Sequence, residues 1–330
     1  MSLSFTTVDG SVGKRLDRIF KVKSSFLKVQ PGECLLPPQY VFIASRIRDL
    51  EIREDDVWIV SYPRTGSHWV QEMVWCIGKD CDFKTAETLI FLRNPLLESS
   101  ALIVTGDYVD WFSKLGNSVE YVEGMQGPRY IKTHLPWELL PTQIHEKKPK
   151  IIYVTRNPKD TCVSFYHYCR TFHGIESSFE EFADLFLEDS APMGAFWNHI
   201  LKFWEHRNDE NVLFLTYEDM KTNQTEMIKK TAKFLNKKIT EEQIEQLKDH
   251  LKFSKMTSNP AVNLEQILPQ KNGNKDDPNI RFIRKGQIGD WKNYMSKDLE
   301  RRFNEWTEKS FKGTGFKFNA DVPNGVIDDI

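Results

Sequence analysis

Two stretches of this chain place a short apolar run, a turn and a helical pattern in the same order, and this constrains the fold more than any other feature. The first has Val57 to Val60, a turn over Tyr62 to Ser67 and a helical pattern from His68 to Ile77. The second has Ile151 to Val154, followed by Asn157 as a helix cap. Short buried strands that alternate with helices are typical of parallel sheets. The sequence therefore predicts an α/β fold, a single domain whose central parallel sheet is flanked by helices.

The remaining segments divide into a short N-terminal part and a long domain. Residues 1–33 lack sustained periodicity and are predicted to form an N-terminal extension, so the domain proper is predicted to span residues 34–330. Val212 to Leu215 is a further predicted strand, and Ser296 is predicted to cap a last helix. The segment from Asn259 to Lys285 is rich in Pro, Gly and Asn and is predicted to be a loop.

Charge and cysteine content exclude several classes of protein. The 330 residues carry 45 Lys and Arg against 47 Asp and Glu, so no overall positive field favours nucleic acid or an acidic membrane. None of the five cysteines has the C-x-x-C spacing of zinc or redox sites, which predicts reduced thiols and no bound metal. The first 25 residues contain no apolar core of a signal peptide, and a cytoplasmic protein is expected.

The first turn, Pro63-Arg64-Thr65-Gly66-Ser67, has the composition of an anion site. A strand-to-helix turn exposes unpaired backbone N–H groups at the positive end of the helix, and Gly66 permits an anion to approach closely. The turn is P-loop-like, but Ser67 and His68 stand where the Walker A motif requires Lys and a magnesium-binding hydroxyl. An ordinary nucleotide kinase or ATPase is therefore disfavoured.

Five segments in a fixed order resemble the motifs of the cytosolic sulfotransferase family, including its insect members and the retinol dehydratase branch. The combination extends over about Cys34 to Gly315 and is far more specific than any one motif. The segments are Tyr62-Pro63-Arg64-Thr65-Gly66-Ser67-His68-Trp69, Tyr130-Ile131-Lys132-Thr133-His134, Arg156-Asn157-Pro158-Lys159-Asp160 with Ser164, Tyr217-Glu218-Asp219-Met220, and Arg284-Lys285-Gly286 followed by Gly289-Asp290-Trp291-Lys292.

The resemblance implies 3′-phosphoadenosine 5′-phosphosulfate (PAPS) as sulfuryl donor and 3′-phosphoadenosine 5′-phosphate (PAP) as product. By the same resemblance, the 5′-phosphosulfate end is held by Arg64, Thr65, Gly66, Ser67, His68 and Trp69, and the 3′-phosphate by Arg156, Ser164, Arg284, Lys285 and Gly286. Trp69, Tyr217 and Phe253 match adenine contacts, and Phe282 lies beside the phosphate clamp. A donor with anionic groups at both ends needs two cationic pockets, which agrees with two strand–turn–helix units and a basic loop.

The chemistry that these residues predict is in-line transfer to a hydroxyl or amine of a small, apolar acceptor. His134 is the expected base, because an imidazole with a pKa near 6.5 can accept a proton at neutral pH. Lys132 lies on the same face of an extended strand and can reach the same sulfuryl group. Arg64 is expected to stabilise the leaving oxygen, with no metal required. His167, His173 and His199 lack metal-ligand spacing and are expected to be structural or surface residues.

Two departures from the family pattern keep alternatives open. Arg64 replaces the usual Lys and cannot donate its proton, and His68 replaces the usual Thr. The chain could therefore be a nucleotide-binding protein without turnover, or the sulfated alcohol could be eliminated to a dehydrated product.

The acceptor and the oligomeric state are less constrained by the sequence. Trp111, Phe112 and Tyr168 are expected acceptor walls. Residues Lys292 to Arg301 lack parts of the dimer motif of many family members, so both a monomer and a homodimer remain open.

Overall fold

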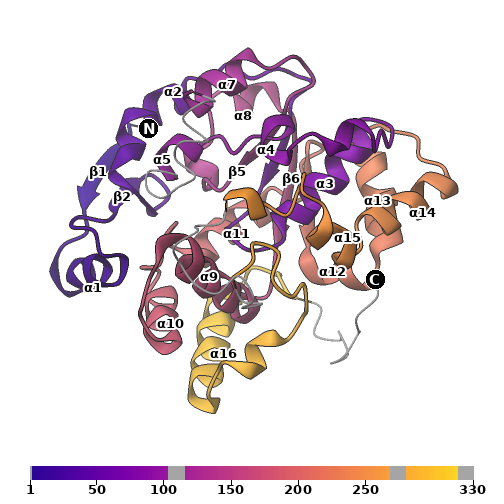
Figure 1. Cartoon of the computed structure of the whole chain (residues 1–330). Helices are drawn as coiled ribbons and strands as arrows, with labels where there is room; N and C mark the ends of the chain where they lie inside the picture. Colours follow the sequence, from indigo (N-terminus) through magenta and orange to yellow (C-terminus); the bar gives the residue numbers. More distant parts are fainter. Residues whose placement is uncertain (1, 103–115, 268–279, 319–330) are drawn as a thin grey trace.

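Four parallel strands form the central sheet of the molecule, in the order β5-β4-β6-β7 (Figure 1). The structure, a computed structural model, describes residues 2–102, 116–267 and 280–318. The strands are β4 (Val57–Val60), β5 (Tyr130–Thr133), β6 (Lys150–Thr155) and β7 (Val212–Thr216). The three strands predicted from the apolar runs are therefore confirmed, as is the α/β fold with its parallel sheet.

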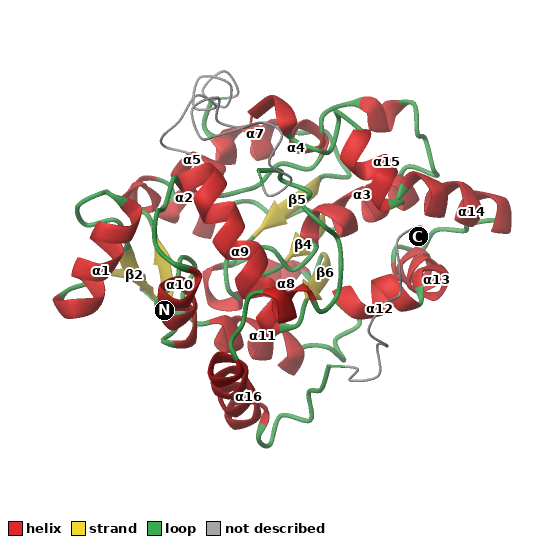
Figure 2. Ribbon diagram, turned by 60° about the horizontal axis from the view of Figure 1, so that its bottom comes forward, coloured by secondary structure: helices red, strands yellow, loops and turns green. Residues whose placement is uncertain are grey.

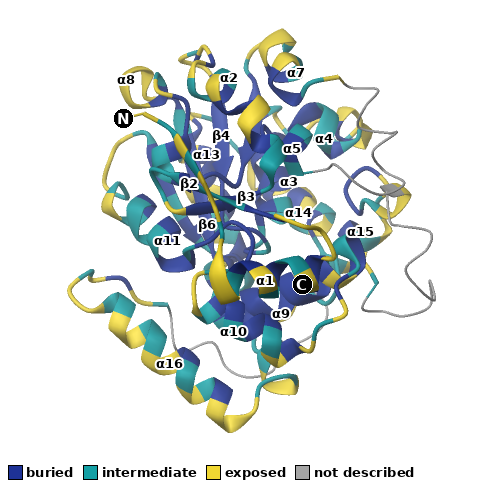
Figure 3. Ribbon diagram, turned by 90° about the vertical axis from the view of Figure 1, so that its left-hand side faces the viewer, coloured by how far each residue is buried: buried dark blue, intermediate teal, exposed yellow. Residues whose placement is uncertain are grey.

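Alternate residues of each strand enter two separate cores, one on each face of the sheet. On β4, Trp58 and Val60 belong to one core, whereas Val57 and Ile59 belong to the other. Because side chains of a strand alternate between faces, a run that is apolar throughout is what a sheet covered on both sides requires. All four residues of β4 are buried, and Figure 3 shows this strand inside the molecule.

Helices cover both faces, which completes the layered arrangement (Figure 2). The first core is closed by α9 (Pro158–His173), α10 (Phe179–Leu187), α11 (Phe196–Glu205) and α16 (Lys297–Phe311). The second is closed by α3 (Ser67–Gly78), α12 (Tyr217–Thr222), α13 (Gln224–Phe234), α14 (Glu241–His250) and α15 (Phe253–Ser258). Shorter helices are α2 (Ala44–Arg48), α4 (Ile90–Arg93), α5 (Ser99–Leu102), α7 (Ser118–Gly124) and α8 (Ile144–Lys147).

Helix starts follow the predicted capping residues. The side chain of Asn157 accepts a hydrogen bond from the backbone N–H of Lys159, and Ser296 accepts one from Leu299. Such a side chain satisfies a donor that the first helical turn leaves without a partner. None of the helices in the described part of the chain is long and apolar enough to cross a membrane.

The N-terminal residues form regular structure that their aperiodic sequence did not predict. Strands β1 (Ser4–Thr7), β2 (Leu27–Gln30) and β3 (Cys34–Leu36) make a second, antiparallel sheet, with α1 (Gly10–Phe20) between the first two (Figure 1). The predicted boundary after residue 33 falls between β2 and β3, so the N-terminal extension stays a prediction and shares a sheet with the predicted domain. The backbone N–H of Met193 donates to the carbonyl of Leu35 at 2.8 Å and ties this sheet to the main body.

Candidate active site

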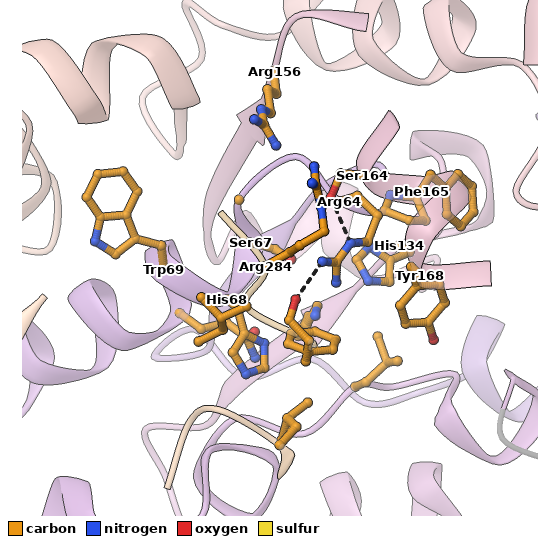
Figure 4. Close-up of a pocket in the computed structure, with 18 of the residues that line it drawn as sticks. Arg64, Ser67, His68, Trp69, His134, Arg156, Ser164, Phe165, Tyr168 and Arg284 are labelled. Carbon is orange, nitrogen blue, oxygen red and sulfur yellow. Dashed lines mark hydrogen bonds between the residues drawn. The ribbon is translucent and has the colours of Figure 1, made fainter. Parts of the chain in front are cut away.

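All four parallel strands end at the same edge of the sheet, and each is followed by a residue that the sequence placed in the site. The turn after β4 contains Arg64, His134 follows β5, Arg156 follows β6 and Tyr217 follows β7. The carboxyl ends of parallel strands are where α/β proteins bind ligands. These residues line one cavity with a volume of about 280 Å³ (Figure 4).

The turn after β4 has the backbone geometry of an anion cradle. Gly66 has φ +96° and directly precedes α3, so the first N–H groups of that helix face the turn. Ser67, His68 and Trp69 line the cavity as predicted. Thr65 differs: its buried hydroxyl donates to the carbonyls of Tyr62 and Val154, so its side chain holds the turn together.

We expect Gly66→Ala to disrupt this turn. A Cβ atom at position 66 would lie 2.6 Å from Cδ2 of Tyr217, and φ +96° is strained for any residue with a Cβ. Donor affinity should fall by at least about tenfold, and the melting temperature should fall by several degrees. Calorimetry and thermal unfolding measure both. Gly313→Ala is the matched control, because Gly313 has φ +81° but no atom within 4 Å of its added Cβ. Equal losses in both variants would contradict the role given to the turn.

His134 is held in one orientation by the end of β4. Its Nδ1 lies 2.8 Å from the carbonyl oxygen of Ser61, so the Nδ1–H donates to that carbonyl. This assigns the neutral tautomer whose Nε2 has a free lone pair, and His134 lines the cavity. Burial, followed by the positive charge of Lys132, holds the pKa of His134 well below its usual value. The imidazole is therefore neutral at physiological pH.

Glu98 holds the backbone of His134 in place. No sequence motif singled out this residue. Its carboxylate accepts hydrogen bonds from the backbone N–H of His134 at 2.6 Å and from the hydroxyl of Thr133 at 2.8 Å. Burial raises the pKa of Glu98 to about 7, although these hydrogen bonds oppose the shift. His199, expected to be structural, donates from Nε2 to the carbonyl of His134 at 3.0 Å. Both ends of the His134 backbone are thus fixed.

Lys132 and Arg64 are two cationic residues that line the cavity. Burial lowers the pKa of Lys132 to about 8, with Glu98 opposing and Arg64 reinforcing the shift. Burial also lowers the pKa of Arg64 to about 10. Arg64 acts to lower the pKa of Lys132, so the two cations repel one another, and an anion bound in the cavity would relieve this repulsion.

Arg64 also connects the first turn to the C-terminal basic loop. Its Nη2 donates to the carbonyl of Phe282 at 2.7 Å, and its Nε donates to the hydroxyl of Ser164 at 3.3 Å (Figure 4). The guanidinium lies over the rings of Phe282 and Tyr168, with centroid distances of 4.6 and 5.2 Å. A lysine would not reproduce this arrangement, because its compact ammonium group lacks the planar face and the separated nitrogen donors of a guanidinium.

The predicted 3′-phosphate clamp is assembled from the turn after β6, from α9 and from the segment after residue 280. Arg156, Ser164, Arg284, Lys285 and Gly286 all line the cavity. Within the described residues, Nε and Nη1 of Arg284 and Nε of Arg156 have no hydrogen-bond partner although they are buried. Unpaired buried guanidinium donors are costly, and a phosphate would satisfy them. The arrangement therefore fits the 3′-phosphate of the expected donor.

Two aspartates that carried no predicted role position this clamp. Asp290 accepts hydrogen bonds from Arg284 at 2.7 Å and Lys285 at 2.8 Å. Burial acts to raise the pKa of Asp290, but the hydrogen bonds from Lys285, Asn293 and Arg284 prevail and lower it to about 2. Asp160, in the first turn of α9, accepts from the backbone N–H groups of Gly289 and Trp291. The basic loop is thus fastened to α9.

The aromatic residues predicted for the adenine lie around the other end of the cavity. Trp69 and Tyr217 are 5.6 Å apart between ring centroids, and the guanidinium of Arg156 lies 4.4 Å from the Tyr217 centroid. Phe253 also lines the cavity, and its ring would lie 2.4 Å from a Cβ added to Gly286, whose φ is +64°. Glycine at 286 therefore permits this close approach.

A large part of the cavity wall is apolar. Tyr168 lines it as predicted, whereas Trp111 and Phe112 lie outside the described residues. The other large apolar side chains of this wall are Phe26, Leu35, Leu102, Phe165, Phe172 and Met193. Phe26 and Leu35 come from the N-terminal part, so residues that precede the central sheet help to shape the cavity.

Comparison with known proteins agrees with this geometry. The family model described as "Sulfotransferase domain" matches residues 54–315. Luciferin sulfotransferase of Photinus pyralis is 40% identical over 301 residues, which cover 89% of this chain and 81% of that protein. Sulfotransferase 1E1 of Homo sapiens is 35% identical over 291 residues, covering 87% and 94%.

A solved structure extends the likeness to almost the whole chain. Retinol dehydratase, in complex with androsterone and the inactive cofactor PAP, has a TM-score of 0.87 and 27% sequence identity, and covers 97% of this chain and 99% of its own. The residues of the five motifs converge on one cavity within the region that the family model matches. The chain belongs to the sulfotransferase family.

Proposed function

We propose that this protein transfers the sulfuryl group of PAPS to a hydroxyl group of a small apolar acceptor, with His134 as the base. The observation that carries the proposal is the position of His134, whose Nδ1 hydrogen bond leaves Nε2 as the basic nitrogen and which lines the same cavity as Lys132 and Arg64. These groups lie between a turn suited to a 5′-phosphosulfate and an apolar wall suited to the acceptor. The PAP complex of retinol dehydratase, which is similar over 97% of this chain, supports the choice of donor.

Each end of the donor has its own set of residues in this proposal. The amides at the start of α3 and the side chains of Ser67 and His68 bind the 5′ end. Arg156, Ser164, Arg284 and Lys285 bind the 3′-phosphate, and Trp69, Tyr217 and Phe253 contact the adenine. A nucleotide without the 3′-phosphate leaves the buried donors of Arg284 unpaired and therefore binds more weakly.

The transfer step makes one bond and breaks one. The acceptor oxygen attacks sulfur while its proton moves to Nε2 of His134, and the bond from sulfur to the bridging phosphate oxygen breaks. The electron pair stays on that oxygen, which departs with PAP. Negative charge grows on the leaving oxygen, where the fixed cations Lys132 and Arg64 are already desolvated and stabilise it without reorganisation.

The proposed reaction is tested by incubating the protein with sulfur-labelled PAPS and a panel of phenols, sterols and retinoid-like alcohols. Label should enter at least one acceptor, and PAP should form in equal amount. The mass of the product distinguishes a sulfate ester from a dehydrated compound, the alternative that the likeness to retinol dehydratase favours. Binding of PAPS without PAP formation with any acceptor would instead indicate a nucleotide-binding protein without turnover.

We expect activity to fall as the pH rises above about 8. Because burial depresses the pKa of Lys132 to about 8 from an ordinary value near 10.5, raising the pH removes its charge well before a normal lysine would lose it. The value of kcat/KM, which reports on the free enzyme, should then decline toward a tenfold loss per pH unit. Lys132→Arg should keep its charge and abolish this decline, even if its rate is lower. An unchanged alkaline limb in Lys132→Arg would show that another group titrates.

A further inference from the structure

Two amide side chains in the wall of the cavity have hydrogen-bonding capacity that the protein leaves unused. Asn94, which follows α4, is 0% exposed, and Gln71, in α3, is 2% exposed. Both line the cavity. Among the described residues, neither side-chain atom of Asn94 has a hydrogen-bond partner, and neither does Oε1 of Gln71. Buried amides are normally paired, so each one left unpaired costs free energy unless a ligand or water satisfies it.

The residues next to these two amides in the sequence do have partners, so the lack of partners is local to the amides. Glu72 and Arg93, each adjacent in sequence to one of the amides, form a buried ion pair with one another. Gln71 uses its Nε2 to donate to the backbone carbonyl of Asn94 at 3.1 Å. This bond fixes the orientation of the Gln71 amide, so its Oε1 is the atom left without a partner.

The two amides lie next to the reacting centre. The backbone N–H of Lys132 donates to the carbonyl of Pro95, and Leu97 donates to the carbonyl of Lys132. The segment that begins with Asn94 therefore runs beside the strand that leads into His134. His68 is one turn before Gln71 on α3, and its ring lies 4.7 Å from that of Phe282, which also packs near Tyr168 and Phe172. Figure 4 shows His68 across the cavity from Tyr168.

The available atoms define the group that would fit. Oε1 of Gln71 and Oδ1 of Asn94 accept hydrogen bonds, so the bound group must have a proton to donate. A carboxylate has none. The bound group must also accept a hydrogen bond from Nδ2 of Asn94. An ammonium group is disfavoured because the cations Lys132 and Arg64 line the same cavity. A neutral hydroxyl group, which both donates and accepts, satisfies these conditions.

We propose that Gln71 and Asn94 form a selectivity subsite for a second hydroxyl group of the acceptor. The favoured acceptors are then flat, apolar compounds with two hydroxyl groups, one that reacts at His134 and one that binds this amide pair. This inference rests on the proposed function, since it describes the acceptor of that reaction. A site built to bind a hydroxyl group discriminates strongly against analogues that lack it, because its buried polar groups are then unpaired.

The test compares 1- and 2-naphthol with a set of dihydroxynaphthalene isomers. In the wild type, kcat/KM for at least one dihydroxy isomer should exceed that of the matching naphthol by at least about tenfold. Asn94→Leu, which is similar in size, and Gln71→Met should reduce this ratio to near one. Gln224→Met is the matched control, because Gln224 is another buried amide without a partner among the described residues and lies outside the cavity lining. It should keep the ratio of the wild type.

Binding to the PAP-loaded protein supplies a readout that does not depend on turnover. Calorimetry should show the same preference for a dihydroxy isomer in the wild type and its loss in Asn94→Leu. Equal ratios in the wild type and the two subsite variants would mean that water alone satisfies the amides, and the inference would be wrong. Absence of label transfer to every naphthol with a preserved binding preference would overturn the proposed reaction while leaving the subsite intact.

Discussion

His134→Asn should lower kcat by about 10²- to 10⁴-fold, the range that removal of a positioned general base produces. Asparagine can still donate to the carbonyl of Ser61, the partner of Nδ1 of His134, so the fold around β4 and β5 should be kept. It has no lone pair suited to accept the proton of the acceptor at neutral pH. The dissociation constant of PAP should change by less than about threefold, because no donor contact is assigned to this side chain. Initial rates at saturating PAPS and calorimetry with PAP measure the two quantities.

A second buried histidine serves as the control for this substitution. His167, in α9, is buried, and burial lowers its pKa to about 4, so it is also neutral at physiological pH. It lies outside the cavity lining, with its ring 5.1 Å from that of Tyr294. His167→Asn should retain most of the wild-type rate. If His134→Asn kept more than a tenth of the rate, or if both variants lost it equally, His134 would not be the base.

Arg284→Met should weaken the binding of PAP by about 10- to 100-fold, which is the expected loss for a charged hydrogen-bond donor to an anion. Nε and Nη1 of Arg284, which have no partner in the described part of the chain, are the groups that a 3′-phosphate would satisfy, while Lys285 still balances the charge of Asp290. Adenosine 5′-phosphate, which lacks the 3′-phosphate, should bind the variant and the wild type with similar affinity. Calorimetric titration with both nucleotides measures the difference.

Arg301→Met controls for loss of a positive charge that has no part in the site. Arg301 is on α16, is largely exposed, and pairs with Asp298 and Glu305. Exposed pairs of this kind contribute little to stability or binding. PAP affinity should therefore be unchanged in Arg301→Met. If Arg284→Met weakened both nucleotides alike, Arg284 would act on the nucleotide generally, and the assignment of the 3′-phosphate clamp would be wrong.

The elements that carry the site were predictable because their signals are local. The apolar runs at Val57 and Ile151 predicted two central strands, and Asn157 marked the start of α9 through its own capping side chain. The need for glycine at position 66 follows from its positive φ in the turn and from the close approach of the Tyr217 ring, and the motifs contain both residues. The motifs supplied positions that no periodicity distinguishes, such as Ser164 and Arg284, and the structure brings them to one cavity.

Other parts depend on contacts between residues distant in sequence. The N-terminal sheet was missed because β1 and β2 are only four residues long, too short for the alternation of Leu27 to Gln30 to stand out, and their pairing is set by tertiary packing. Glu98 becomes functional only because it meets the backbone of His134. Asp290 belongs to a motif segment, but its role becomes apparent only where it pairs with the basic loop. A lone acidic residue in a sequence gives no sign of such a partner. Trp111 and Phe112 stay predictions.

A crystal structure with PAP and an acceptor bound is the most direct test of the central claim, that one cavity places the donor between two anion sites with His134 facing the sulfuryl position. We expect the 3′-phosphate within about 3 Å of Ser164 and Arg284, the 5′-phosphate at the start of α3, and the acceptor hydroxyl within about 3 Å of Nε2 of His134. PAP bound in the reverse direction, or an acceptor hydroxyl far from His134, would contradict the account.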